Sequence, residues 1–575
     1  MPSVFRTGYG CAVQLLLILL WLTDIKDSDS YFFVYALCAL AGIFCIYSNQ
    51  QDYRTRTARQ YAGILIPAAL FSVMVVLANY PVYEPITASG SVFKLCADLL
   101  GGTVIAANIL SWLLNRLPVA VTGTEARNRP LQFFALCMAS FVVIDVVYLI
   151  FCDFPGVLTA DSVNQMNQIY SGEYNNLNPF WHTRTIGIFV NIGKTLFGTY
   201  QAGVAVFSVV QILFMAACFS YVLVTLYQKH IPWKWIAVCW MIYGLLPYQI
   251  AYSVTMWKDV LFSGACLLLT TALYRILSRM PGKKSPDFLL FIAGSFGMCL
   301  WRTNGLLAYG VLFLAMLIAA AKNGKLIKTM AVIFGVCILL NSVVLSAMNV
   351  GGGSYVEALS VPLQQVARVV YEGRDLEPEA LELIETVADE QRIRDTYEDE
   401  ISDPIKELVR SSDAEEQIQK DPLPYLKLWL DLGSQYPADY VKAWVDLTKG
   451  YWNGGYDYWI WTDDVYENHM GIEEAAVGGP VGKLMDLYFR YSRLIVFLQP
   501  VVSIGLNTWL LMLCWIVDRK QGRMEWLLLL PSFSILLGLL IGTPVYAEFR
   551  YAYPMILSCP LIVSATWFSS STEKD

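Results

Sequence analysis

Charged residues are scarce in this chain of 575 residues: only 15% are Asp, Glu, Lys or Arg, whereas 56% are hydrophobic. Soluble domains carry about 25% charged residues, so this composition excludes an ordinary water-soluble enzyme. The apolar residues occur in blocks without the strict alternation of a membrane β-barrel. Because only helices and closed barrels can cross a bilayer, the sequence predicts an all-α, polytopic membrane protein.

Several common functional motifs are also missing. The sequence has no Walker A motif, no Gly-rich dinucleotide fingerprint and no H-E-x-x-H zinc motif. No cysteine lies in the segment 349–490, and no C-x-x-C pattern occurs anywhere, which excludes disulfides from that segment and a C-x-x-C metal site from the chain. Inside the apolar blocks, Asp98 and Asp145 are the main acidic residues, fewer than a proton-coupled transporter usually carries.

The apolar blocks predict about fourteen membrane-spanning helices, each of roughly 20 residues. The basic loops between them all fall on one side, together with both termini, and the positive-inside rule makes that side cytoplasmic. A further segment, 186–197, is too short to cross the bilayer. Counting it as a span would also place every later basic loop on the opposite side. We therefore expect it to be interfacial or re-entrant. The expected spans are 10–23, 31–47, 61–79, 95–114, 132–152, 203–227, 236–251, 259–277, 287–301, 305–321, 327–348, 492–516, 524–542 and 551–569.

The spans define four parts of the chain. Residues 1–131 form an N-terminal module of four helices, and residues 132–348 form a core with a long outer loop at 153–202. Residues 349–490 form an acidic, mostly helical insert outside the cytoplasm. Within it, apolar residues at helical spacing predict a hairpin of two helices over 423–451, broken at Ser434–Pro437. Residues 491–575 add the last three spans.

The long outer loop contains the first candidate for chemistry. Asp161 lies just outside the membrane, where a carboxylate can act as a general base toward a hydroxyl group. The alternative is structural, with Thr159 or Asp161 capping the helix that begins at Ser162. His182 and Arg184 follow in the same loop, and a lone histidine is more often a hydrogen-bonded structural residue than a catalyst.

Three further outer segments contain cations beside carboxylates. Lysine and arginine can bind phosphate, arginine through a planar fork of donors. The alternative is that the charges simply form ion pairs with one another. The residues are Lys258 and Asp259, then Arg302 with Asn304 in a tight turn, then Glu548 and Arg550 at the start of the last span.

The insert contains a dense aromatic segment, 450–461. Aromatic faces stack on the C–H surfaces of sugars, so these residues could bind a glycan. An aromatic belt at the lipid interface explains the same composition equally well. The candidate residues are Trp452, Tyr456, Trp459 and Trp461.

This arrangement resembles the GT-C superfamily of membrane glycosyltransferases. The resemblance rests on an acidic residue in the first long outer loop (Asp161), a following proline-containing segment (178–183), a surface helix (186–197) and the charged pair Lys258-Asp259. The turn at Arg302 and the element at Glu548–Tyr551 look like phosphate-binding positions. The paired acidic motif of several GT-C families is missing, because Ser162 follows Asp161, and the water-facing domain is an insert rather than C-terminal.

The resemblance implies an inverting transfer of a sugar from a polyprenyl-phosphate donor to an acceptor glycan, lipid or polymer at the outer face of a bacterial cell membrane. Asp161 would be the base. Lys258, Arg302 and Arg550 would bind the donor phosphate, supported by Asp259, Glu548, His182, Arg184 and Asn304.

Other functions stay open at this point. A glycan polymerase or ligase would also use a lipid-linked donor and arginines, and a lipid or glycan transporter would do no chemistry. The expected partners are the bilayer, the lipid-linked sugar and a cell-envelope acceptor, and no nucleic acid. The sequence identifies no cofactor, although a divalent cation is compatible with such a site.

Overall fold

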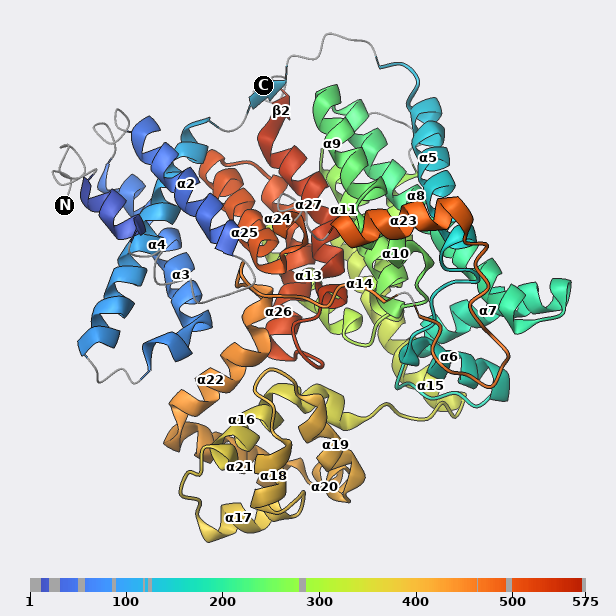
Figure 1. Ribbon diagram of the computed structural model, residues 1–575. Helices are drawn as coiled ribbons and strands as arrows, with labels where there is room; N and C mark the ends of the chain where they lie inside the picture. Colours follow the sequence, from blue (N-terminus) through green and yellow to red (C-terminus); the bar gives the residue numbers. More distant parts are fainter. Residues whose placement is uncertain are drawn as a thin grey trace.

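The computed structural model describes residues 12–19, 32–49, 57–84, 89–116, 119–121, 127–278, 286–462, 464–492 and 499–570, which are almost entirely helical (Figure 1). The expected basic loops containing Arg54, Arg56, Arg279, Lys283 and Lys284, and the ends of the expected span 10–23, lie outside these residues.

Six helices of the described residues are long and apolar enough to cross a membrane. Helices of this kind are typical of a membrane-associated protein. They are α3 (Ala58–Ala78), α4 (Ser89–Arg116), α5 (Pro130–Phe151), α8 (Tyr200–Gln228), α11 (Lys258–Leu277) and the continuous helix Gly324–Ala347, which contains α14 (Gly324–Leu339), a π-turn (Leu340–Val344) and α15 (Leu345–Ala347).

The other expected spans are shorter, bent or less apolar helices. The pair α9 (Trp233–Gly244) and α10 (Pro247–Val254) is bent by 48° and could count as a seventh span. The bend lies at Pro247, whose ring removes a backbone donor. The remaining helices are α2 (Phe32–Ser48), α12 (Asp287–Leu300), α13 (Gly305–Ala319), α24 (Gln499–Val502), α25 (Ile504–Gln521), the 3₁₀ turn η9 (Glu525–Leu529), α26 (Leu530–Ile541) and α27 (Phe549–Trp567). Length and composition alone therefore show fewer spans than the about fourteen expected.

Two expected boundaries can be compared with the structure. Residues 493–498 of the span placed at 492–516 lie outside the described residues; most of the rest is α24 and α25, and α25 begins at Ile504, where the hydroxyl of Ser503 accepts a hydrogen bond from the amide of Leu506, and continues past 516 to Gln521. The surface helix placed at 186–197 is longer, since α7 runs over Phe180–Phe197. It buries Ile186 and Val190 and exposes the apolar Ile188 and Leu196, as an interfacial helix does.

The N-terminal helices form a small group of their own. Residues 12–19, α2, α3 and α4 pack around Ile18, Ala39, Val75 and Ile105, and the 3₁₀ turn η4 (Tyr80–Tyr83) follows α3. The linker after α4 forms the short strand β1 (Val119–Val121), which pairs in parallel with β2 (Phe568–Ser570) after α27.

The centre of the bundle is α11, which packs against α8, α12 and α27. Nearly all of its residues from Asp259 to Arg275 are buried. A helix that is apolar on every face and buried on every face lies inside a bundle rather than at its edge. The first residues of α11 and α27 therefore lie next to each other at one end of this core.

From Tyr355 to Thr448 the acidic insert forms a separate group of short helices at that same end, drawn in yellow and orange below the bundle in Figure 1, whereas its last helix (Gly479–Ser492) lies against α5 and α10. The helical hairpin expected at 423–451 is confirmed as α21 and α22, which are separated at Tyr436–Pro437. The insert contains η6 (Tyr355–Leu359), α16 (Ser360–Tyr371), α17 (Pro378–Glu385), α18 (Glu390–Thr396), α19 (Asp403–Ser411), α20 (Ala414–Lys420), α21 (Pro422–Gln435), α22 (Pro437–Thr448), η7 (Lys449–Tyr451) and α23 (Gly479–Ser492).

Candidate functional site

The outer loop before α6 (Ala160–Ser171) is tied by its backbone to the segment before α11. Val157 forms a parallel bridge with Thr255: its amide donates to the carbonyl of Val254, and its carbonyl accepts from the amide of Met256, both at 3.0 Å. The indole of Trp257 also donates to the hydroxyl of Thr159, at 2.8 Å. These bonds fix Asp161 opposite Lys258, although the two residues are far apart in the sequence.

Thr159, and not Asp161, caps α6. Thr159 and Ser162 form a reciprocal capping box, and the hydroxyl of Ser162 also donates to the carbonyl of Met256 at 2.8 Å. Of the two helix caps that the sequence allowed, Thr159 is therefore the one present. The carboxylate of Asp161, in the first turn of the helix, is left to interact with other groups.

Asp161 interacts with two cations from different helices. Its Oδ2 lies 3.3 Å from Nζ of Lys258, the first residue of α11, and 3.0 Å from Nη1 of Arg550, in the first turn of α27. Lys258 also donates to Oδ1 of the buried Asn178 at 2.6 Å, and Arg550 pairs with Glu548. The side chain of Asp161 is 37% exposed, so this ionic cluster is open to the surroundings.

A second ion pair lies deeper at the same end of the bundle. Arg302, in the turn between α12 and α13, pairs with Asp259, whose side chain has no solvent exposure. The Arg302 guanidinium lies 4.6 Å from the centre of the Tyr551 ring, and that of Arg550 lies 5.0 Å from the same ring. Tyr551 therefore connects the deep pair to the outer cluster through cation–π contacts.

Three helix N-termini converge on these residues. Asp161, Lys258 and Arg550 each lie in the first turn of α6, α11 or α27. A helix N-terminus carries a partial positive charge and unsatisfied backbone donors. Together with the lysine and arginine side chains, this arrangement favours an anionic group at the cluster.

The charges of the cluster alter its acid–base properties. The ammonium of Lys258, with help from Arg550, lowers the pKa of Asp161 to about 2. Burial raises the pKa of Glu548 above its ordinary value, although Arg550 acts in the opposite direction. Asp161 is therefore ionised at neutral pH, whereas Glu548 is the carboxylate more easily protonated.

His182 lies behind Asp161 on the buried face of α7. Burial, with a smaller contribution from Lys258, lowers its pKa to about 3, so the imidazole is neutral. Its Nδ1 lies 3.0 Å from the side-chain amide of Gln165, and its buried Nε2 has no hydrogen-bond partner among the described residues. This environment matches a structural histidine near the site, the commoner role for a lone histidine.

Several expected site residues lie away from the cluster. Arg184 is exposed and donates to the hydroxyl of Tyr174 at 3.0 Å, and Asn304 is exposed at the start of α13 without capping it. Both were expected in supporting positions, yet neither contacts the ionic cluster, because each side chain projects from the exposed side of its segment.

The aromatic segment of the insert does not act as one surface. Trp452 is buried and stacks on Trp444, and the hydroxyl of Tyr456 donates to Glu400 at 3.1 Å. Trp461 contacts the ring of Phe489. Trp459 differs from the other three: it is 48% exposed, and its ring centre lies 5.8 Å from that of Trp257.

Trp459 is thereby placed close to the cluster. The face of Trp257 also contacts Arg550, with the guanidinium 5.2 Å from the ring centre. Of the four aromatic residues expected to bind an acceptor, Trp459 is the one that is both exposed and adjacent to Asp161's partners.

Three residues at the site were given no role of their own from the sequence, although Asn178 and Tyr551 lie in segments on which the resemblance rests. Asn178 accepts the hydrogen bond of Lys258, Gln165 contacts His182, and Tyr551 lies between two arginines. Gln165 lies four residues after Asp161 in α6, a spacing that places two side chains on one helical face. That spacing was the available signal; the other two contacts depend on the tertiary fold.

The described residues contain no group of three metal-ligating side chains close enough to hold a metal ion. At the cluster, Asp161, Asp259 and Glu548 each pair with a cation of the protein. The divalent cation considered from the sequence therefore has no ligand set there.

The matching family model covers residues 171–575, which include Lys258, Arg302 and Arg550 and begin after Asp161. The chain belongs to a family of unknown function, DUF6020. Comparison with curated proteins and comparison with solved structures give no match.

Proposed function

We propose that this member of DUF6020 is a membrane glycosyltransferase that moves a sugar from a polyprenyl-phosphate donor to an acceptor hydroxyl. The observation that supports the proposal most strongly is the placement of Asp161, a half-exposed carboxylate held between Lys258 and Arg550 where three helices begin. A carboxylate beside a cationic site is the pair of groups that such a transfer requires: a base for the acceptor and a site for the phosphate.

The donor phosphate would bind to Lys258 and Arg550. Arg302 lies deeper in the bundle, against the ring of Tyr551, and would add positive charge on the inner side of the site. In the cluster the three cations are balanced by three carboxylates. A bound phosphate would release Asp161 from its two partners. Protonation of Glu548, whose pKa is already raised by burial, would compensate the added negative charge.

The proposed reaction is a single displacement. Asp161 takes the proton of the acceptor hydroxyl as the acceptor oxygen bonds to the anomeric carbon. The bond from that carbon to the phosphate oxygen breaks, and the polyprenyl phosphate leaves with the bonding electrons. One displacement inverts the anomeric configuration. Cations placed where charge develops lower the barrier most, and here they contact the leaving phosphate.

Asp161 would become a stronger base during this process. Lys258 and Arg550 hold its pKa at about 2 when they pair with it directly. A phosphate that neutralises both cations removes that effect, so the pKa of Asp161 rises only when the donor is bound. The exposed ring of Trp459 would then provide a stacking surface for the acceptor sugar.

The proposal includes a full membrane arrangement. About fourteen apolar segments would cross the cytoplasmic membrane of a bacterium as a GT-C-like core. Both termini would be cytoplasmic, and the insert 349–490 and the cluster would face outward. Two features support this: the basic loops fall on one side of the expected spans, and the insert helices α16–α21 lie at the same end of the bundle as α6 (Figure 1).

The test uses the full-length protein in liposomes with a panel of radiolabelled polyprenyl-phosphate sugars. The acceptors are glycans and lipids extracted from the cell envelope. We expect donor consumption by the wild type and a loss of about 10²–10⁴-fold in Asp161→Asn, the usual contribution of a general base. Glu173→Gln is the matched control, because Glu173 is an exposed carboxylate just after α6 that contacts no residue of the cluster.

Two outcomes would contradict the proposal. If Asp161→Asn consumed donor as fast as the wild type, Asp161 would not be the base and a polymerase or ligase without a carboxylate base would fit better. If the wild type consumed no donor with any acceptor but moved a labelled lipid or glycan across the liposome membrane, the protein would be a transporter.

A further inference from the structure

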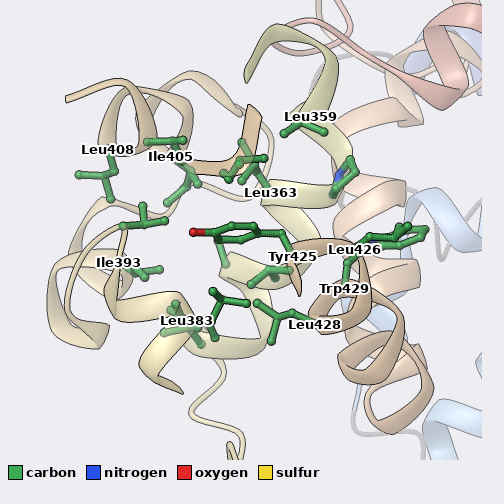
Figure 2. A pocket seen from close by; sticks show the side chains of 18 of the residues that line it. Leu359, Leu363, Leu383, Ile393, Ile405, Leu408, Tyr425, Leu426, Leu428 and Trp429 are labelled. Carbon is green, nitrogen blue, oxygen red and sulfur yellow. The ribbon is translucent and has the colours of Figure 1, made fainter. Parts of the chain in front are cut away.

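The insert contains a large apolar cavity. Its volume is about 300 Å³, and it is lined by residues of α16, α17, α18, α19, α20, α21 and the segment before α16. Figure 2 shows Leu363, Leu383, Ile405 and Leu408 arranged around it, with the ring of Tyr425 among them. Protein interiors are normally packed with few voids larger than a water molecule, whereas ligand pockets begin at about 300 Å³.

The cavity opens beside an exposed apolar row on α21. Leu426 lines the cavity and is 50% exposed, and Leu423 and Leu430 continue the row at 70% and 56% exposure. Their spacing places these three leucines along one side of the helix. Such a row in a water-facing domain is an apolar path into the cavity.

The helix that follows α21 is attached to the end of a candidate membrane span. The next helix, α22, packs against α3, and its Asp446 accepts a hydrogen bond from Tyr80 at 2.8 Å, just after α3 ends. Lys442 of α22 pairs with Glu84 at 2.5 Å. The hairpin of α21 and α22 is therefore held at the end of a helix that is apolar enough to lie in the bilayer.

A polar pocket of about 400 Å³ lies next to the apolar cavity, because Leu383 and Leu428 line both. Its charged lining residues are Glu377, Glu379, Glu382 and Asp431 against one cation, Lys427. This excess of negative charge favours a positively charged group and opposes a phosphate-only headgroup.

We infer that the insert binds a hydrocarbon chain of an amine-headed membrane lipid, with the chain in the apolar cavity and the amine at the acidic pocket. The cavity gives the chain a dry environment, and its burial supplies the binding free energy. This site is separate from the ionic cluster and does not depend on the proposed sugar transfer.

A shift of the cavity helices on lipid binding would be transmitted to the ionic cluster through hydrogen bonds to the backbone before Arg550. The carbonyl of Pro544 accepts from the hydroxyl of Ser360, the first residue of α16, at 2.9 Å and from Lys406 of α19 at 2.6 Å. The amide of Ser402 donates to the carbonyl of Val545 at 3.0 Å. The helices α16 and α19 that line the cavity therefore also hold the segment that leads to Arg550.

The test is photo-crosslinking of the full-length protein in phosphatidylcholine nanodiscs. The nanodiscs contain a trace of phosphatidylethanolamine or phosphatidylglycerol with a diazirine in one chain, and adducts are mapped by mass spectrometry. We expect adducts on α16 and α21 with phosphatidylethanolamine, in about tenfold excess over phosphatidylglycerol. The double variant Glu379→Lys/Glu382→Lys should reverse this preference.

Two variants test the cavity itself. Ala367→Trp fills it from α16, and Leu426→Glu places a charge at its edge on a side chain that is 50% exposed, where a charge can reach water. Each should reduce the adducts about tenfold, whereas Glu385→Gln on α17, outside both pockets, should leave them unchanged.

The inference would be overturned by the absence of insert adducts in the wild type. Adducts that persist in Leu426→Glu, or that form equally with phosphatidylglycerol, would also overturn it. Labelling by a dissolved alkylamine but not by the membrane lipid would show that the ligand does not come from the bilayer.

Discussion

The deep ion pair of Arg302 and Asp259 makes the sharpest prediction about stability. The carboxylate of Asp259 is fully buried, Arg302 is its partner, and its Oδ2 has no hydrogen bond among the described residues. Arg302→Met would leave that carboxylate buried without compensation. Breaking a buried pair from one side costs about 3–5 kcal/mol. We therefore expect Arg302→Met to lower the free energy of unfolding by about this amount.

The reverse change should cost less. In Asp259→Asn the guanidinium of Arg302 keeps two aromatic partners, Tyr551 at 4.6 Å and Phe262 at 5.7 Å. Desolvated cation–π contacts are worth about 2 kcal/mol or more, so we expect a loss of about 1–3 kcal/mol. The double variant removes both charges and should lose less than the sum of the two single variants, by about 1–3 kcal/mol.

The assay is equilibrium unfolding of the purified protein in detergent, followed by tryptophan fluorescence. Arg184→Gln is the matched control, because Arg184 is exposed and should change the unfolding free energy by less than about 0.5 kcal/mol. Additive losses in the double variant, or a cost below about 1 kcal/mol for Arg302→Met, would refute the argument that the pair stabilises this end of the bundle as a unit.

Three further predictions concern the ionic cluster and the topology. Lys258→Met removes the main cause of the low pKa of Asp161 in the free protein, so the pH below which kcat/KM for the donor falls should move upward, as measured by a pH–rate profile. Trp459→Ala should raise the KM for the acceptor about three- to tenfold with little change in kcat, and equal KM values would exclude a stacking role. In intact cells, Glu379→Cys should react with an impermeant maleimide and Lys520→Cys should not; the opposite pattern would place the insert in the cytoplasm.

The sequence alone pointed to most residues of the candidate site, but it did not show which of them contact one another. A charged side chain at the end of an apolar block is energetically costly unless it has a function or an ion-pair partner. For this reason Lys258, Arg302 and Arg550 were candidates. Which carboxylate pairs with which cation depends on how α6, α11 and α27 are placed, because Asp161 and Arg550 are 389 residues apart in the chain. Local patterns contain no information about that distance.

Side-chain direction explains the residues that were misplaced. Arg184 is close in sequence to His182, yet on α7 one side chain is exposed and the other is buried. In the aromatic segment 450–461 no regular period applies, so the sequence could not separate the buried Trp452 from the exposed Trp459. Both distinctions arise from the packing of the helices on either side.

The sequence by itself determined that the chain is helical and apolar, that it has an acidic insert, and that its unusual charges gather near helix ends. These properties follow from composition and periodicity, which act over one or two helical turns. Only the tertiary structure decided that Thr159 rather than Asp161 caps α6, that Asp161 lies between two cations, and that the insert encloses an apolar cavity. Such features arise where segments distant in the sequence meet, and their geometry is set by the packing of the whole bundle.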